Sequence, residues 1–287
     1  LHVEPLGYIF ACLASFLWIV TTIYAIGYMR GHHEQNQTQF YFWFAVAIGA
    51  TMGIALAGNM LTLFVFYEVL TFATWPLVTH SKTDAARKSG RIYLGILLST
   101  SMGFLLVSIS LVWWLTGTLD FIPGGVFDDN VSAPLLSIVY ALFVFGVGKA
   151  ALMPFHGWLP AAMVAPTPVS ALLHAVAVVK AGVFTLLKGT FYLFGINNLS
   201  ASGANEYLIP IAALTIILAS LIAMKQDNLK ARLAYSTVSQ LSYVVLAVLV
   251  ANIMGIIAAA MHLVMHAFAK ITLFFCAGAI MVSTHKT

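Results

Sequence analysis

The sequence predicts an all-α, polytopic bundle of transmembrane helices, and composition and hydropathy both point to it. Of the 287 residues, 61% are hydrophobic and only 8% are charged, which leaves too few polar side chains to cover a soluble domain. The mean hydropathy is +0.97. Apolar runs of about 20 residues, the length that crosses a bilayer core, recur along the whole chain. We therefore expect a single transmembrane domain over residues 1–287.

Nine of these runs are long enough to span a membrane. A tenth piece, at about 155–165, follows Pro154 and is too short to cross alone. Because proline removes a backbone donor and breaks a helix, we interpret this piece as the second half of a helix broken at Pro154. The nine predicted spans are about 5–29, 39–57, 59–79, 90–116, 133–153, 167–194, 207–225, 229–251 and 254–282.

The charges of the predicted loops support this count. If the nine helices alternate in direction, every Lys and Arg of the loops lies on one side of the membrane. The charged residues of the loops on the other side are all acidic. Basic loops face the cytoplasm in most membrane proteins, so the basic side is predicted to be cytoplasmic. Its basic residues are Arg30, Lys82, Arg87, Lys88, Arg91, Lys225, Lys230, Arg232 and Lys286.

The composition argues against several other classes of protein. Cys12 and Cys276 lie far apart in apolar helices, with no metal-ligand spacing near them, so we expect two buried apolar side chains, no metal site and no cofactor. The formal charge of +4 is divided between loops and buried positions, which does not indicate nucleic-acid binding. The chain lacks an initiator Met and a signal peptide, and stops just after a helix; we expect a fragment of a longer subunit.

A small set of ionisable residues falls inside the predicted spans. Charged groups in a bilayer are costly, face the bundle interior and typically mark ion or proton paths. Lys188 lies near a helix end, so it could equally reach the interface and be structural. The set contains Glu68, Lys149, His174, Lys180, Lys188, His262, His266 and Lys270.

Three of these residues share one face of the last predicted helix. His262, His266 and Lys270 are four residues apart in turn, which keeps them within roughly 80° of arc and about 12 Å of axis. Histidine titrates near neutral pH and passes protons through two ring nitrogens. This stripe predicts a proton relay, although interhelical hydrogen bonds that only hold the bundle together remain an alternative.

The other ionisable residues extend the predicted path. Lys149 precedes Pro154 and is placed on the last turn before the break, where freed carbonyls can hold water. Glu68 is the one acid inside a predicted span, and we expect it to form an ion pair with Lys149. His174 and Lys180 follow on the next helix, about 120° apart, so they need not share one face.

Two other functions stay open at this point. The histidines could ligate haem or bind quinone in a membrane subunit of a redox enzyme. The polar residues could also belong to a scaffold in which they only join helices.

At these residues the sequence resembles a known family: the antiporter-like membrane subunits of respiratory complex I, multisubunit Mrp-type Na⁺/H⁺ antiporters and membrane-bound hydrogenases. The resemblance rests on four stretches, and the second and fourth are highly specific. They are FYEVLTFATWPLV at 66–78, the segment at 145–184, DNLKARLAYSTVSQLSYV at 227–244 and HLVMHAFAKITLFFCAGA at 262–279.

The resemblance implies a fold of inverted five-helix repeats. The first repeat would cover about 39–194, and the second would begin near 207 and be truncated. It also implies that the buried residues form a hydrated axis that moves protons. By motif these are Glu68, Lys149, His174, Lys180, His262, His266 and Lys270.

The sequence departs from the family pattern in two places. The charged residue of the family's broken helix twelve is absent because the given sequence ends before that helix, and the run 229–251 has no acid matching Glu68. The lysine in VVKAG and the run KITLFFCAGA look more like the D-type chain of an Mrp antiporter than the distal subunit of complex I.

The resemblance also implies partners and a location. The expected partners are other membrane subunits, the lipid bilayer and protons, with Na⁺ as a second candidate cation and no nucleic acid. The expected location is a bacterial or archaeal inner membrane. Any enzymatic activity would belong to an oxidoreductase-like or hydrogenase complex, not to this chain alone.

Overall fold

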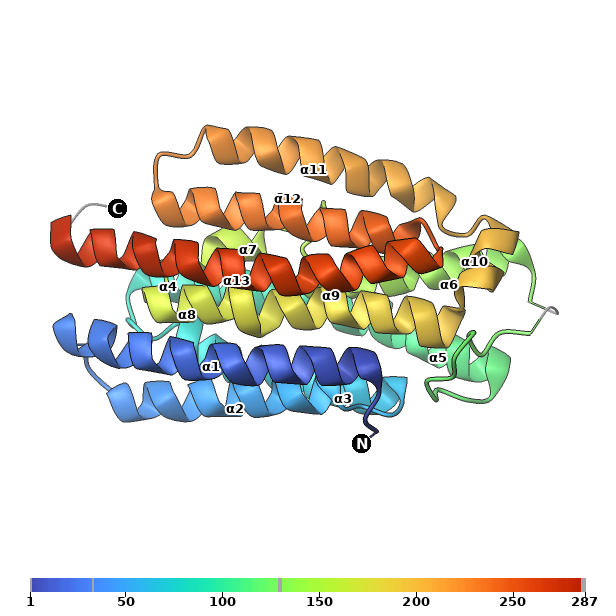
Figure 1. Cartoon of the computed structure of the whole chain (residues 1–287), viewed down its shortest axis with the longest axis horizontal. Helices are drawn as coiled ribbons and strands as arrows, with labels where there is room; N and C mark the ends of the chain where they lie inside the picture. Colours follow the sequence, from blue (N-terminus) through green and yellow to red (C-terminus); the bar gives the residue numbers. More distant parts are fainter. Residues whose placement is uncertain (1, 33, 129–130, 285–287) are drawn as a thin grey trace.

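The computed structural model describes residues 2–32, 34–128 and 131–284. Its long helices run side by side as one bundle, with α1 and α2 at one edge and α11 at the opposite edge (Figure 1). The elements, with π and 3-10 segments written η, are α1 (Pro5–Gly31), α2 (Gln37–Ala55), α3 (Met60–Val78), α4 (Asp84–Thr100), η1 (Ser101–Leu105), α5 (Leu106–Thr116), α6 (Ala133–Gly146), η2 (Gly148–Ala150), α7 (Trp158–Ala161), η3 (Ala162–Val164), α8 (Thr167–Ala171), η4 (Leu172–Val176), α9 (Val178–Gly189), η5 (Thr190–Phe194), α10 (Ile196–Ser202), η6 (Glu206–Leu208), α11 (Ile209–Met224), α12 (Leu229–Leu249) and α13 (Ile253–Thr284).

Local chemistry explains where several helices begin. Asn59, Thr83 and Asn228 each accept a side-chain hydrogen bond from the backbone N–H three residues later, at 2.8, 3.2 and 3.0 Å. Such caps satisfy donors that the first turn of a helix leaves free. Helices α1, α6, α8 and α11 instead begin with proline in the first turn, where its missing N–H costs nothing.

The number of clear spans is smaller than the predicted nine. Within the described residues, seven helices are long and apolar enough to cross a membrane, and an eighth is counted if the segments Val178–Phe194 and Ile196–Ser202, bent by 80°, form one span. The predicted run 133–153 is the main difference, because α6 has only 14 residues and ends at Gly146. The all-helical bundle itself is confirmed.

The helix break begins earlier than Pro154. Lys149 lies in η2, beyond the end of α6, and not on the last turn of a helix as predicted. A side chain at Gly146 would meet the backbone of Leu105 and one at Gly148 would meet Thr100. These two glycines therefore let the chain pack closely against the preceding helix pair, and Ala151 then takes a positive φ of 56°. Packing, and not proline alone, determines the break.

The two cysteines are not buried as predicted. Cys12 and Cys276 are both exposed on the outside of the described bundle. A small apolar side chain can face lipid as readily as a helix neighbour, so hydrophobicity alone could not decide which way it points.

Helix α9 occupies the centre of the bundle, and all twelve of its residues are buried. It packs against α2, α3, α12 and α13 and against η2. The π segments η4 and η5 lie on either side of it, and Gly195, with φ 79°, follows the second. Because π segments are frequent at functional sites, this short regular helix between two of them is a natural support for functional side chains.

The contact at Gly182 predicts a selective destabilisation. A Cβ at this position would meet the backbone of Lys149 and Ala150, so Gly182→Ala forces α9 away from η2 and should cost about 1–3 kcal/mol. The matched control is Gly49→Ala, because a Cβ there meets nothing within 4 Å. We expect the melting temperature of the purified protein to fall for Gly182→Ala alone. Equal melting temperatures for the two variants would contradict the close packing of α9.

Candidate functional site

Lys149 is fully buried and is held by α3. Its Nζ donates to the Tyr67 carbonyl at 2.8 Å and to the Thr71 hydroxyl at 2.6 Å. The ammonium also lies 3.2 Å from the centre of the Tyr67 ring, and the backbone N–H of Lys149 donates to the Tyr67 hydroxyl at 3.1 Å. A buried cation thus receives two oxygen acceptors and an aromatic face, which offsets part of the loss of water.

The predicted ion pair between Lys149 and Glu68 does not form. In the part of the chain that the structure describes, neither carboxylate oxygen of Glu68 has a hydrogen-bond partner, although the side chain is buried on α3. The reason is helical geometry: Tyr67 and Thr71 share one face of α3, whereas Glu68 points about 100° away from Tyr67. Glu68 is therefore not one of the groups that bind the Lys149 ammonium.

Lys180 and His266 form a direct contact between α9 and α13. The Nζ of Lys180, which is fully buried, lies 2.7 Å from Nδ1 of His266. One member of the pair must donate and the other accept, so the two groups cannot both be fully protonated. This shared hydrogen bond provides a route for one proton between two helices.

The stripe on α13 faces the bundle at two of its three positions. His266 and Lys270 are buried, whereas His262 is half-buried and its ring stacks on His266 with centroids 6.0 Å apart. Lys270 donates to the Ser236 hydroxyl and, at 3.1 Å, to the Leu233 carbonyl of α12. The three residues therefore extend from Lys180 towards a polar wall on α12.

His174 lies outside the residues whose side chains the structure describes. Its backbone belongs to η4, the π segment that precedes α9. The predicted place of His174 in the path stays a prediction.

Lys188 is buried and has partners from two other segments. It forms an ion pair with Glu4 at 2.5 Å, donates to the Ala57 carbonyl at 2.6 Å, and lies 4.6 Å from the centre of the Phe121 ring. Both charged side chains are buried. The sequence indicated Lys188 but offered no sign of Glu4, because Glu4 precedes the first apolar run and resembles an ordinary terminal charge.

The oxygen atoms that hold the lysines were also missed in the sequence. Tyr67, Thr71 and Ser236 are polar residues in apolar or mixed helices, and such residues more often bond to their own helix. The available signal was spacing, since Tyr67 and Thr71 are four residues apart and present two oxygens on one face. Which lysine would reach them depended on the position of the helix break.

The buried ionisable residues form two groups, and helix α9 contacts both. Glu68 and Lys149 form the first group, and Lys180 with His262, His266 and Lys270 forms the second. Within the described residues no hydrogen bond joins Lys149 to Lys180, but Gly182 seats α9 against the backbone of Lys149. Helix α9 therefore sets the position of one group relative to the other.

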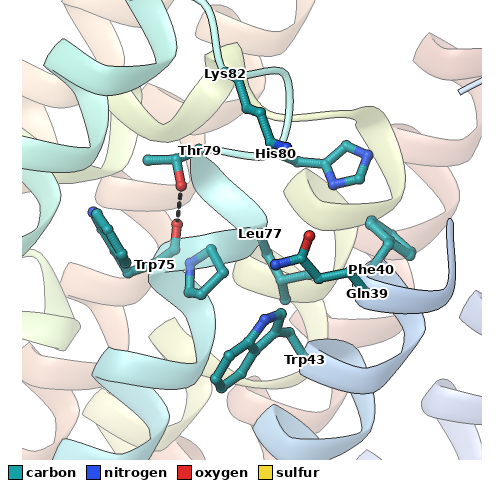
Figure 2. Close-up of a pocket in the computed structure, with 9 residues that line it drawn as sticks. Gln39, Phe40, Trp43, Trp75, Leu77, Thr79, His80 and Lys82 are labelled. Atoms are coloured by element: carbon teal, nitrogen blue, oxygen red, sulfur yellow. Dashed lines mark hydrogen bonds between the residues drawn. The ribbon is translucent and has the colours of Figure 1, made fainter. Parts of the chain in front are cut away.

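The pocket in Figure 2 lies apart from these groups. It has a volume of about 280 Å³ and lies where the start of α2 meets the end of α3. Trp43, Trp75 and Leu77 form part of its wall, and none of the predicted site residues lines it. Burial is the main cause that lowers the pKa of His80 at this pocket, so the imidazole is mainly neutral near pH 7 and offers little charge to a ligand.

The contact between Lys149 and Thr71 predicts a measurable stability cost. Thr71→Val removes one of two oxygen acceptors from a buried ammonium and should destabilise the protein by about 1–3 kcal/mol. Thr51→Val is the matched control, because Thr51 is equally buried but bonds only to the Ala47 carbonyl of its own helix. Unfolding in detergent, followed by circular dichroism, compares the two. Equal losses would show that Lys149 does not depend on Thr71.

Comparison with known proteins places this arrangement in a family. Residues 57–287 match the family described as "NADH:quinone oxidoreductase/Mrp antiporter, TM". A probable K⁺/H⁺ antiporter protein of the A/B type from Rhizobium meliloti (strain 1021) is 30% identical over 98% of this chain and 28% of its own length. The chloroplastic NAD(P)H-quinone oxidoreductase subunit 5 of Chaetosphaeridium globosum is 32% identical, over 98% of this chain and 42% of its own length. The expected likeness to a D-type chain stays a prediction.

Solved structures agree with the sequence matches. A chain of the Mrp complex from Dietzia sp. DQ12-45-1b has a TM-score of 0.86 and 29% identity, covering 97% of this chain and 30% of that one. A chain of an archaeal membrane-bound sulfane sulfur reductase has a TM-score of 0.82 and 26% identity, covering 96% of this chain and 56% of that one. This chain thus spans only part of the length of these relatives. Its apolar helices and these matches show that it is a multi-pass membrane protein of the NADH:quinone oxidoreductase/Mrp antiporter family.

Proposed function

We propose that this chain carries protons within a larger membrane complex, through the buried residues Glu68, Lys149, Lys180, His266 and Lys270. The observation that carries the proposal is the hydrogen bond between Lys180 and His266, which joins two titratable groups of different helices at 2.7 Å in the bundle interior. A scaffold would not need two titratable groups here, since a pair of neutral side chains would join the helices at lower cost.

The chemistry of this pair supports a transfer in either direction. A proton on the Lys180 ammonium can move along the hydrogen bond to Nδ1 of His266, leaving a neutral amine and an imidazolium. Because the imidazole has two distinct nitrogens, it can then release a proton on its other side. Lys270 lies one turn further along α13. Its positive charge changes the free energy of protonating Lys180.

The first group supports the same function in a different way. Lys149 is held by neutral oxygens, and the Glu68 carboxylate lies nearby without bonding to it. A proton that arrives at Glu68 would neutralise its carboxylate and so change the electrostatic field at the Lys149 ammonium. We propose that His174 and His262 contribute to the same path, in accordance with the family motif.

The assembly and the transported ions belong to the proposal as well. The relatives' names describe parts of an antiporter and of a quinone oxidoreductase, and the two solved structures are those of membrane complexes. We infer that this chain has other membrane subunits as partners, that it is not an enzyme alone, and that protons are its main cargo, with Na⁺ as a second candidate. We also propose the two inverted repeats, 39–194 and from 207 onward, in a bacterial or archaeal inner membrane.

Binding of haem or quinone by the histidines is not favoured. Nδ1 of His266 is already bonded to Lys180, and His262 and His266 stack on one another along the same helix. Two axial ligands would have to approach from opposite sides of a haem, which adjacent turns of one helix face do not allow.

We propose that the basic loops face the cytoplasm. The connections after α1 and α11 lie at one end of the bundle, and the connection between α12 and α13 lies at the other (Figure 1). A single cysteine at Gln226, in a strain in which Cys12 and Cys276 are replaced by Ser, should resist a membrane-impermeant maleimide in intact cells. A cysteine at Asp120 should react. The reverse labelling would contradict the proposed orientation.

Replacement of the first group tests the proton path. We expect Lys149→Met in the intact complex to lower proton transport at least about tenfold, because the buried cation cannot be replaced by a neighbouring group. Glu68→Gln should lower it in the same way. Transport is measured in proteoliposomes with a pH-sensitive dye, and an unchanged set of copurifying subunits is the control for assembly. Transport at the wild-type rate in the double variant Glu68→Gln/Lys149→Met would refute the proposed path.

A further inference from the structure

The ion pair between Glu4 and Lys188 has no place in the path described so far. Burying an ion pair is costly, because both charges lose their contact with water. Both side chains are buried, and the carboxylate and the ammonium are 2.5 Å apart. This pair therefore either only stabilises the fold or takes part in transport.

The surroundings of the pair join three parts of the chain. Glu4 is the residue immediately before α1, where the positive end of the helix favours a carboxylate. The Ala57 carbonyl, which also accepts from Lys188, lies in the connection between α2 and α3. The far end of α9 is thus attached to α1 and to the α2–α3 connection by one ammonium group.

Lys188 and Lys180 lie on the same helix, near its two ends. They are eight residues apart within α9, which corresponds to about 12 Å along the axis and roughly 80° of rotation. Lys180, at the near end, contacts His266. A regular helix transmits a shift or rotation of one end to the other, so the position of Lys188 determines where Lys180 lies.

The elements on either side of α9 differ from a regular α-helix. Both neighbours, η4 and η5, are π segments, and Gly195 ends the second with a bend of 80°. α9 and η5 form one helix, Val178–Phe194, and its direction changes only after Phe194. The contacts of Lys188 therefore act near the end of a helix that also carries Lys180. Gly182, midway along, rests against the backbone of Lys149.

We propose that Glu4 and Lys188 form a positioning pair that anchors α9 and thereby sets the distance between Lys180 and His266. Neither residue carries the transported proton. Loss of the anchor lets α9 shift, which lengthens the hydrogen bond through which Lys180 and His266 exchange a proton. This inference rests on the proposed function and adds two residues that control it from the opposite end of the helix.

The expected signature is a change in the pH dependence of transport. Among the side chains that the structure describes, the charged or titratable groups that face Lys180 are His266 at 2.7 Å and, at longer range, Lys270 and His262. A displaced Lys180 changes its interaction with all three, so the pH at which the pair exchanges protons should shift. If the pair only stabilised the fold, its loss would lower the amount of assembled complex and would leave the pH profile of transport unchanged.

The decisive variant is the double replacement Glu4→Gln/Lys188→Met in the intact complex. Removing both charges avoids an unpaired buried ion, so the protein should still assemble. We expect transport at least about tenfold slower, since small misplacements of reacting groups cost that much or more, together with a shifted pH optimum. Lys188→Arg retains the pair and should retain the wild-type profile. A double variant with wild-type rate and pH profile would overturn the proposal.

Two further variants complete the test. If the double variant fails to assemble, Glu4→Asp decides, because it keeps both charges and shortens the anchor by one methylene; it should shift the pH optimum, and an unchanged profile overturns the proposal. Thr185→Val is the matched control on α9, since Thr185 bonds only to the Ala181 carbonyl of its own helix, and it should leave transport unchanged. Lys149→Met, measured alongside, separates the two hypotheses: if it transports at the wild-type rate, the proton path itself fails.

Discussion

The structure depends on the need of each buried lysine for an oxygen or nitrogen atom from another segment. Helix α9 is buried on every side and carries Lys180 and Lys188, which find acceptors on α13, in the segment before α1 and in the α2–α3 connection. Lys149 and Lys270 do the same with α3 and α12. Because no water is available in the bilayer core, these contacts determine which helices must be neighbours.

The missing bond between Glu68 and Lys149 changes the physical picture of the first group. A closed ion pair holds both charges in one state and resists a change of protonation. Here the ammonium is held by neutral oxygens, and the carboxylate lies nearby without bonding to it. Such an arrangement lets the protonation state change more easily than a closed ion pair does. The Glu4–Lys188 pair, at 2.5 Å, has the opposite character.

Most of the fold could be predicted from the sequence. The apolar runs located α1, α2, α3, α11, α12 and α13 to within a few residues, because a bilayer requires spans of nearly constant length and composition. The predictions failed where packing competes with that rule. Gly146 and Gly148 end α6 early because they permit contact with a neighbouring helix, and the exposed cysteines show that apolar character does not distinguish a lipid-facing side chain from a buried one.

The sequence by itself determined that the protein is a membrane bundle and that Glu68, Lys149, Lys180, Lys188, His266 and Lys270 lie inside it, since the cost of a charge in lipid is a property of the residue and its neighbours along the chain. Spacing within one helix also placed His266 and Lys270 on a common face. Only the tertiary structure decided the partners: Lys149 with Thr71, Lys180 with His266 and Lys188 with Glu4. These contacts join residues far apart in the chain, and they depend on helix rotation and on where each helix breaks.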